Sequence, residues 1–312
     1  ISCSLVGSEM CIRDSIMIIN PQTLRGIYMG FNTLFNKAFE GVTPMYTEVA
    51  MVTPSTTAAE TYAWLGDIPG MREWIGDREI QNLTASGYTI RNKPFELTLG
   101  VDRDAVEDDK IGLYNPSVEN LAQAAAAHPD KLIFELLKNG FSELCYDGKA
   151  FFAADHQVGG KSFSNKGTAK LTLDAYVAAR TAMMSMTNSK GEPLGLVPDK
   201  LVVPPALEKN ARDILVADYI NGTRNTMQGT AKPVVVPRLA GKDSAWYLLC
   251  TTRPIKPLIY QQRKKAKFVS LTSENDANVF MKKQFLYGVD CRGNAGFGFW
   301  QMAYGSDGSA DS

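Results

Sequence analysis

The chain has 312 residues, of which 45% are hydrophobic and 21% are charged, with 33 Lys plus Arg against 33 Asp plus Glu. A chain of this length is expected to form about two domains, and its composition excludes a disordered or collagen-like protein. The formal net charge of zero excludes a strongly basic nucleic-acid binder, and no run approaches the ~18 apolar residues that span a bilayer.

The first residues differ in character from the rest of the chain. Residues 1–16 have no basic start, no apolar stretch and no small-residue cleavage site, so they do not fit a signal peptide. They resemble translated sequencing-adapter read-through. We therefore leave them out of the fold and expect a chain that starts at Met17 to fold and assemble like the full one.

A first helix is predicted to begin after Asn20 and to end at Gly41. Asn20 is a favoured cap residue, and Pro21 suits the first helical position. The apolar residues at helical spacing are Leu24, Ile27, Tyr28, Phe31, Leu34, Phe35 and Ala38. Residues 42–70 keep no sustained period, so we expect an extended arm or loop there.

The chain from Arg72 to Val101 is rich in strand signals. Tyr88 and Ile90 alternate with polar residues, and the turn residues at 92–94 follow. The next apolar residues alternate strictly and are Phe95, Leu97, Leu99 and Val101. This pattern predicts a long hairpin with one apolar face.

A second helix is predicted from Asn115 to Gly140. Pro129 is expected to kink it or to restart it near His128. The apolar residues beyond the proline, which we expect to face a sheet, are Leu132, Ile133, Leu136 and Leu137. At 1.5 Å per residue the two parts span about 35 Å, which suits a spine.

The second half of the chain mixes helices and strands. Helices are expected at 172–186 and 205–220. Strands are expected at 200–203, 233–238, 245–250, 257–262, 266–271, 284–291 and 297–303. Because no regular βαβ alternation is present, the fold class is α+β.

Candidate catalytic groups are few. The two histidines are His128 and His156, and Asp155 beside His156 is a weak candidate for an acid–base or metal pair. The sequence has no GxSxG, HExxH or P-loop, and its five cysteines form no CxxC pair. We therefore expect free thiols in a reducing compartment, and no catalytic residue, metal or cofactor.

Three further patterns have a structural interpretation. The acidic run at 102–109 fails as a calcium loop at Val106, so we expect a solvated face or a partner for arginines. The basic run at 263–267 is expected to be a turn between two strands, with a polyanion-facing patch as the alternative. Gly293, Gly296 and Gly298 predict a strand that another backbone approaches closely.

Several elements thus have apolar faces without an evident partner in the chain, which favours an assembly protein. Four blocks, at 62–116, 128–141, 146–156 and 287–305, resemble the Mu-like prophage major head subunit (gpT) family. The resemblance implies the Hong Kong 97 fold, with an N-terminal arm, an extended β-hairpin loop, a peripheral domain with a long spine helix, and an axial domain.

The resemblance also implies a domain order. It assigns 17–60 to the arm, 61–112 to the extended hairpin loop, 113–170 to the spine helix and peripheral domain, 171–250 to the axial domain, and 251–312 to return strands and a C-terminal tail.

The implied function is that of a major capsid subunit, which self-assembles as hexamers and pentamers into an icosahedral shell around double-stranded DNA. DNA contacts would be non-specific, a scaffold and a maturation protease are further expected partners, and no membrane or cofactor is involved. The implied location is the virion capsid, assembled in the bacterial host cytoplasm. The alternatives are an encapsulin-like nanocompartment shell and a cytosolic enzyme centred on Asp155 and His156.

The expected subunit interface lies on the extended loop, which in this fold crosses onto a neighbouring subunit. Arg72, Trp74 and Arg78 are its main candidates, because Trp and Arg often carry interface energy. The further candidates are Tyr88, Ile90 and Phe95. The expected salt-bridge partners are Asp102, Asp104, Glu107, Asp108 and Asp109.

Overall fold

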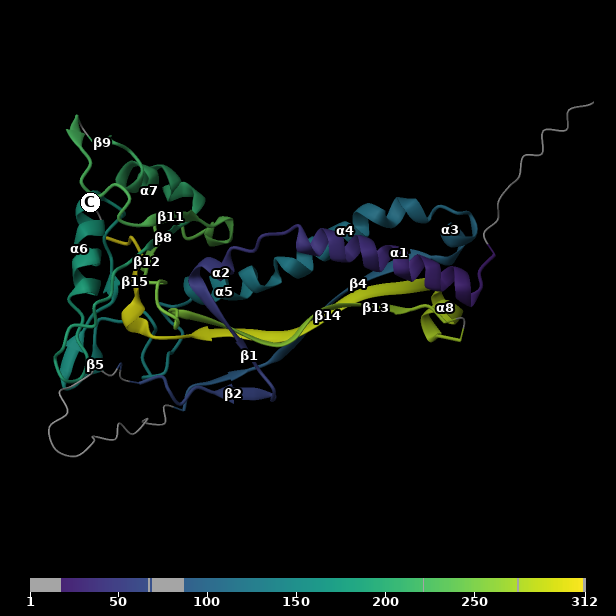
Figure 1. The fold of residues 1–312 in the computed structure, drawn as a ribbon, viewed down its shortest axis with the longest axis horizontal. Coiled ribbons are helices and arrows are strands. Elements are labelled where there is room, and N and C mark those ends of the chain that lie inside the picture. The colour runs from purple at the N-terminus through teal and green to yellow at the C-terminus, as the bar shows by residue number, and fades with distance from the viewer. Residues whose placement is uncertain (1–17, 67, 69–86, 221, 274, 311–312) are drawn as a thin grey trace, which may run out of the picture. The chain divides into compact units, whose positions relative to one another are not determined.

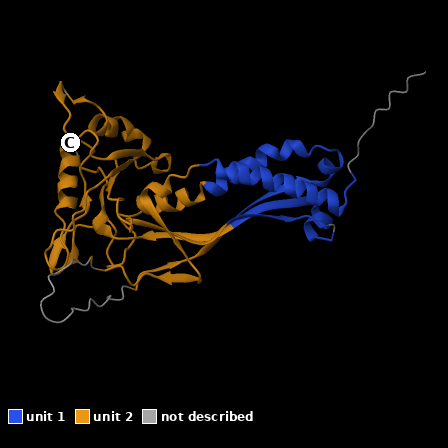
Figure 2. Cartoon of the chain, viewed as in Figure 1, with its two compact units in different colours: residues 1–42, 95–126, 266–290 blue, residues 43–94, 127–265, 291–312 orange. Residues whose placement is uncertain are grey.

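The computed structural model describes residues 18–66, 68, 87–220, 222–273 and 275–310. They form two compact units, coloured separately in Figure 2. Unit 1 takes residues 1–42, 95–126 and 266–290, and unit 2 takes 43–94, 127–265 and 291–312. No helix in the described residues combines the length and apolarity needed to cross a membrane.

Unit 1 is built on helix α1 (Pro21–Glu40), as the sequence predicts. The Asn20 side chain accepts a hydrogen bond from the Thr23 backbone N–H at 2.8 Å, and Gly41 caps the other end. The buried residues of its apolar stripe are Leu24, Ile27, Phe31 and Phe35. Helix α1 packs against α4 (Asn115–Ala126), and the two lie side by side in Figure 1.

A sheet completes the core of unit 1. Strands β13 (Leu258–Leu271), β14 (Gln284–Phe297) and β4 (Lys93–Asp102) lie in that order in a four-stranded sheet whose other edge strand is β1 (Ala50–Pro54). Residues 266–271, 284–290 and 95–102 of these strands belong to unit 1. Phe31 and Phe35 of α1 meet the sheet at Tyr287 and Phe268, with ring centroids 5.0 and 5.2 Å apart respectively. Shorter elements are α3 (Arg103–Glu107), η1 (Ile111–Tyr114) and α8 (Ala277–Lys282).

The prediction of a hairpin that turns at residues 92–94 is wrong. Strand β3 (Thr89–Arg91) pairs antiparallel with β2 (Ala59–Thr61), whereas β4 pairs with β14. The physical reason lies in Asn92, whose side chain donates to the Ser55 hydroxyl and to the Thr57 carbonyl. The Asn92 amide is therefore bonded to the segment before β2, and the backbone continues from β3 into β4 without a turn.

The helix predicted from Asn115 to Gly140 is interrupted and restarts near Pro129, as the sequence predicts. Helix α4 ends at Ala126 and α5 (His128–Lys138) follows. In α5, Ile133 and Leu137 are fully buried as expected, but Leu132 and Leu136 are only half-buried. The fully buried Phe134 was not in the predicted stripe.

Unit 2 is centred on a five-stranded mixed sheet in the order β11-β8-β12-β15-β7. These strands are β7 (Lys166–Gly167), β8 (Lys200–Val203), β11 (Lys232–Val235), β12 (Trp246–Leu249) and β15 (Ala303–Ser306). The helices of this unit are α2 (Tyr46–Val49), α5, α6 (Leu173–Met184) and α7 (Glu208–Leu215), with η2 (Pro205–Leu207), η3 (Pro237–Leu239) and η4 (Trp300–Met302). Its other strands are β1 (Ala50–Pro54), β2, β3, β5 (His156–Val158), β6 (Lys161–Phe163), β9 (Tyr219–Ile220) and β10 (Thr223–Arg224), together with residues 258–265 of β13 and 291–297 of β14.

The α+β fold class is confirmed, and four local predictions need correction. The strands predicted at 257–262 and 266–271 form one strand, β13, so the basic run at 263–267 is not a turn. The helix predicted at 205–220 ends at Leu215, and the last strand begins only at Ala303, after η4. Residues 42–70 contain α2, β1 and β2 instead of a continuous loop.

The close approach predicted at the glycines is confirmed. A Cβ at Gly293 would lie 2.6 Å from the Gln261 carbonyl oxygen, and one at Gly298 would overlap the Lys256 carbonyl. At Gly296 the space is filled by the Ile90 side chain.

Candidate assembly site

The expected interface residues fall into two groups. Arg72, Trp74 and Arg78 lie outside the described residues. Ile90 is 3% exposed and packs in the core of unit 2, which removes it from an exposed interface. Tyr88 and Phe95 are half-buried, and the Tyr88 hydroxyl accepts a hydrogen bond from the Phe297 backbone N–H at 2.8 Å.

The segment between β2 and β3 is flanked by a partly buried polar network, which we call the loop root. Its members are Ser55, Glu60, Tyr62, Asn92 and Gln261. At one end the Tyr62 hydroxyl donates to Gln261 Oε1 at 2.9 Å. Gln261 Nε2 then donates to the Ile90 carbonyl at 3.0 Å and to Asn92 Oδ1 at 2.8 Å.

The network continues from Asn92 to β2. Asn92 Nδ2 donates to Ser55 Oγ at 2.8 Å, and Ser55 Oγ donates to Glu60 Oε1 at 2.8 Å. The backbone closes the same region, because the Tyr62 N–H donates to the Tyr88 carbonyl at 2.9 Å. Gln261 is fully buried and Asn92 is 8% exposed, so the loop root is a satisfied polar network inside an apolar core.

Glu60 holds the turn that leads into β2. Its Oε1 accepts hydrogen bonds from the Thr56 and Thr57 backbone N–H groups at 2.8 and 3.1 Å. The Thr56 N–H, followed by the Ser55 hydroxyl and the Thr57 donors, lowers the pKa of Glu60 from 4.5 to about 2. The charged carboxylate is therefore the form that stabilises this turn.

This pKa gives a prediction for pH-dependent stability. Because the folded pKa is depressed, the Glu60 contribution is complete above pH 4.5 and is lost as the pH falls from 4.5 to 2. Glu60→Gln does not titrate, so the melting-temperature difference between wild type and variant should shrink over this window. A difference that stays constant with pH would contradict the role of the charge.

The acidic run at 102–109 is partly neutralised within its own unit. The Asp102 carboxylate caps α3 through the Asp104 backbone N–H at 3.0 Å. Glu107 pairs with Arg103 at 3.0 Å, and Asp108 pairs with Lys110 at 2.9 Å. Asp104 and Asp109 are exposed and form no ion pair with another described residue, so they remain the candidates for an inter-subunit partner.

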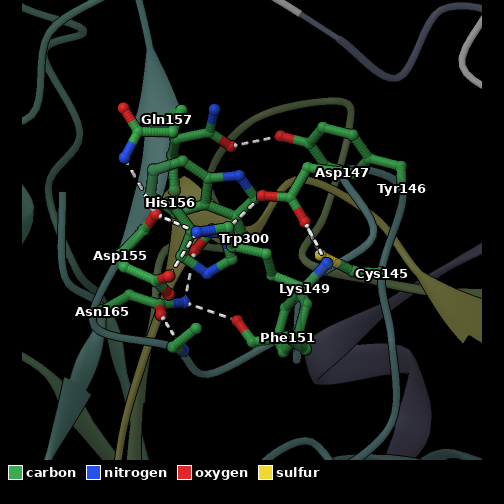
Figure 3. A network of polar contacts seen from close by, with 12 residues as sticks. Cys145, Tyr146, Asp147, Lys149, Phe151, Asp155, His156, Gln157, Asn165 and Trp300 are labelled. Atoms are coloured by element: carbon green, nitrogen blue, oxygen red, sulfur yellow. Dashed lines mark hydrogen bonds and ion pairs between the residues drawn. The ribbon is translucent and has the colours of Figure 1, made fainter. Parts of the chain in front are cut away.

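The proposed Asp155–His156 pair does not form in the structure. His156 Nδ1 contacts Asp147 Oδ2 at 2.5 Å, whereas Asp155 pairs with Lys149. Figure 3 shows the Asp147 carboxylate between His156 and Cys145, whose thiol donates to Asp147 Oδ1 at 3.1 Å. The sequence reasoning missed Asp147 and Cys145, although the Asp147–Gly148 turn signal lay just upstream.

Two members of this cluster, Cys145 and His156, are buried, whereas Asp147 is partly exposed. His156 is fully buried and stacks on Trp300 at 4.0 Å between ring centroids. Burial, followed by the neighbouring Asp147 carboxylate, raises the pKa of the Cys145 thiol. Burial also opposes the Asp147 charge, but hydrogen bonds from His156, Cys145 and Lys149 leave the pKa of Asp147 below its ordinary value. His128, on α5, is half-buried and lies apart from this network, and burial lowers the pKa of its imidazole.

Comparison with known proteins identifies the family. The model of the Mu-like prophage major head subunit gpT family matches residues 24–170, 163–239 and 238–312. The chain is 34% identical to the Mu-like prophage FluMu major head subunit of Haemophilus influenzae, over 92% of this chain and 73% of that protein. It is 33% identical to the major capsid protein of Escherichia phage Mu, over 92% of this chain and 74% of that protein.

A solved structure agrees with these relatives. The subunit in the procapsid of bacteriophage JBD30 is 38% identical, with a TM-score of 0.60 over 92% of this chain and 76% of that chain. The fold is therefore of the Hong Kong 97 type found in phage capsid proteins, and the head-subunit function is favoured over the nanocompartment and enzyme alternatives. The chain belongs to the Mu-like prophage major head subunit family and is a major capsid subunit.

Proposed function

We propose that this capsid subunit forms hexamers and pentamers that close into an icosahedral shell, and that residues 62–88 clamp each subunit onto its neighbour. The observation that supports the clamp is the loop root. Tyr62 and Tyr88, at the two ends of this segment, are held by buried hydrogen bonds to Gln261, to Phe297 and to each other. Because the two ends of the segment are fixed to the core, a contact that residues 72–78 make with a neighbouring subunit would hold the two subunits together.

The proposed domain order keeps the expected boundaries. Residues 17–60 would form the arm, 61–112 the extended loop, 113–170 the spine and peripheral domain, 171–250 the axial domain, and 251–312 the return strands and tail. Residues 171–250 fall entirely within unit 2, whereas each of the other four segments is divided between units 1 and 2.

Packaged double-stranded DNA is the proposed polyanionic partner. The side chains of Arg263 and Lys265 are exposed on one face of β13 within unit 2 and form a short basic strip. Such a strip suits non-specific phosphate contacts, whose strength falls as salt is raised. The chain carries no net charge overall, so this contribution would be local.

The remaining partners and the location follow from the family. A procapsid form is described for the JBD30 relative, which supports a scaffold and a maturation protease as proposed partners. The proposed location is the virion capsid, after assembly in the cytoplasm of the bacterial host. We propose no enzymatic activity, since the homologues are structural proteins and Asp155 is engaged with Lys149.

The clamp is tested by Trp74→Ala and Arg78→Glu. Both variants should keep the circular dichroism of the wild type but sediment as small species instead of capsomers and shells. If Arg78 meets the acidic run of a neighbour, adding Asp104→Lys to Arg78→Glu should restore part of the assembly, whereas Asp104→Lys alone should impair it. Closed shells of normal stability from both single variants would refute the clamp.

A further inference from the structure

A second site, unrelated to the loop root, lies in unit 2 around Cys145. Cys145, Asp147 and His156 each offer one ligand atom, and these atoms lie within 4.8 Å of one another. The three residue types are those that bind Zn²⁺ most often in proteins. The three candidate ligands come from one tight turn and one strand that lie close together in the sequence.

The turn is well defined. The Cys145 N–H donates to the Lys149 carbonyl at 2.8 Å, and the Gly148 N–H donates to the Cys145 carbonyl at 3.1 Å. Gly148 has φ of +78°, a conformation that L side chains rarely adopt. This turn presents Cys145 and Asp147 on the same side, toward His156 at the start of β5.

The third ligand is held in place by its surroundings. The His156 ring lies parallel to the Trp300 indole, with an interplanar angle of 6°. Strand β5 pairs with β6, with His156 opposite Phe163. The imidazole is thus locked before any ion binds, which reduces the entropy cost of binding.

We propose that Cys145, Asp147 and His156 bind one Zn²⁺ ion per chain, with water in the fourth position. Zinc lies about 2.3 Å from sulfur and about 2.0–2.1 Å from oxygen or nitrogen, so its ligand atoms are roughly 3–4 Å apart. The Sγ–Oδ1 separation is 3.1 Å, the Nδ1–Oδ2 separation is 2.5 Å, and the three ligand atoms all lie within 4.8 Å of one another, so the imidazole and the carboxylate would move apart around the ion. The Asp147 side chain is 20% exposed, which gives water access to the open position.

Charge also favours a divalent ion. A Cys145 thiolate and the Asp147 carboxylate carry two negative charges, which Zn²⁺ neutralises, and His156 binds as the neutral imidazole. Lys149 and Asp155, which also lie in this network in Figure 3, pair with each other. A thiolate and an imidazole together select Zn²⁺ over Mg²⁺ or Ca²⁺, which prefer oxygen ligands.

The test uses the full chain, stripped with EDTA and reloaded with Co²⁺ as a spectroscopic probe for zinc. We expect one Co²⁺ per chain, a thiolate-to-metal charge-transfer absorption band, and displacement of Co²⁺ by Zn²⁺. Cys145→Ser and His156→Asn should each remove the band. Cys250→Ser, which changes another buried thiol, and Asp155→Asn, which changes the neighbouring carboxylate, should leave it unchanged.

The proposal is overturned if the wild type shows no charge-transfer band, or if the band survives in Cys145→Ser. In either case the cluster is a structural hydrogen-bond network in which the Cys145 thiol and the His156 ring donate to the Asp147 carboxylate. Should Cys145→Ser fail to fold, loss of the band in His156→Asn and its retention in Cys250→Ser decide the question. Loss of the band in Cys250→Ser would also overturn the assignment. The measurement does not depend on shell formation, so it stands apart from the clamp.

Discussion

Replacing Phe134 by alanine is expected to lower the free energy of unfolding by about 3–5 kcal/mol, the usual cost of truncating a buried aromatic side chain. Phe134 is fully buried on α5 and belongs to the main core of unit 2. Helix α5 packs against α2 and η3, so the cavity left behind would be enclosed by elements from distant parts of the chain. Urea unfolding of the dissociated subunit measures this loss.

Leu136→Ala is the matched control on the same helix. Leu136 is half-buried, so its truncation should cost clearly less than that of Phe134. Equal losses for the two variants would mean that α5 is rotated from the orientation described, and would contradict the account of this core.

Gln261→Ala is expected to destabilise the subunit by roughly 3–5 kcal/mol and to prevent closed shells from forming. The change removes the Gln261 hydrogen bond from three groups, namely the Tyr62 hydroxyl, the Ile90 carbonyl and the Asn92 side-chain oxygen. Each such group costs about 1–3 kcal/mol when no replacement is available. The loop root would also loosen, so assembly should fail even at temperatures where the subunit stays folded.

The control for this variant is Gln262→Ala, one residue further along β13. Gln262 is half-buried and lies on the opposite side of the strand, outside the loop root. The Gln262→Ala variant should assemble normally. Sedimentation and circular dichroism of both variants measure assembly and folding. Normal shells from Gln261→Ala would show that the loop root is not needed for assembly.

The elements that the sequence predicts well are those with local signals. Asn20 and Pro21 mark the start of α1, and Pro129 marks the restart at α5, because capping and the missing proline N–H act within one turn of helix. Lys200–Val203 is predicted to the residue, since a short apolar run has few alternatives once its sheet is buried.

The loop root depends on partners that no local pattern reveals. Gln261 and Asn92 are 169 residues apart, and their hydrogen bond converts an apparent turn at Asn92 into extended chain. The basic run at 263–267 resembles a turn by composition, yet its side chains are simply exposed along one long strand. Phe134 lies off the predicted stripe yet is fully buried, and its helix α5 packs against α2 and η3, whose positions depend on the whole fold.

The sequence also fails to predict the partners of His156, although they lie close to it along the chain. Asp155 is adjacent in sequence but lies before the start of β5 and pairs with Lys149, whereas His156 contacts Asp147. A turn signal at Asp147–Gly148 predicts where the chain reverses, not which side chain it will meet.

Negative-stain electron microscopy of the purified chain tests the central claim most directly, that this protein is a shell-forming subunit. We expect closed particles of uniform size, or rings of capsomers under conditions that prevent closure. A protein that remains a folded monomer or dimer at every concentration and salt condition tried would contradict the account.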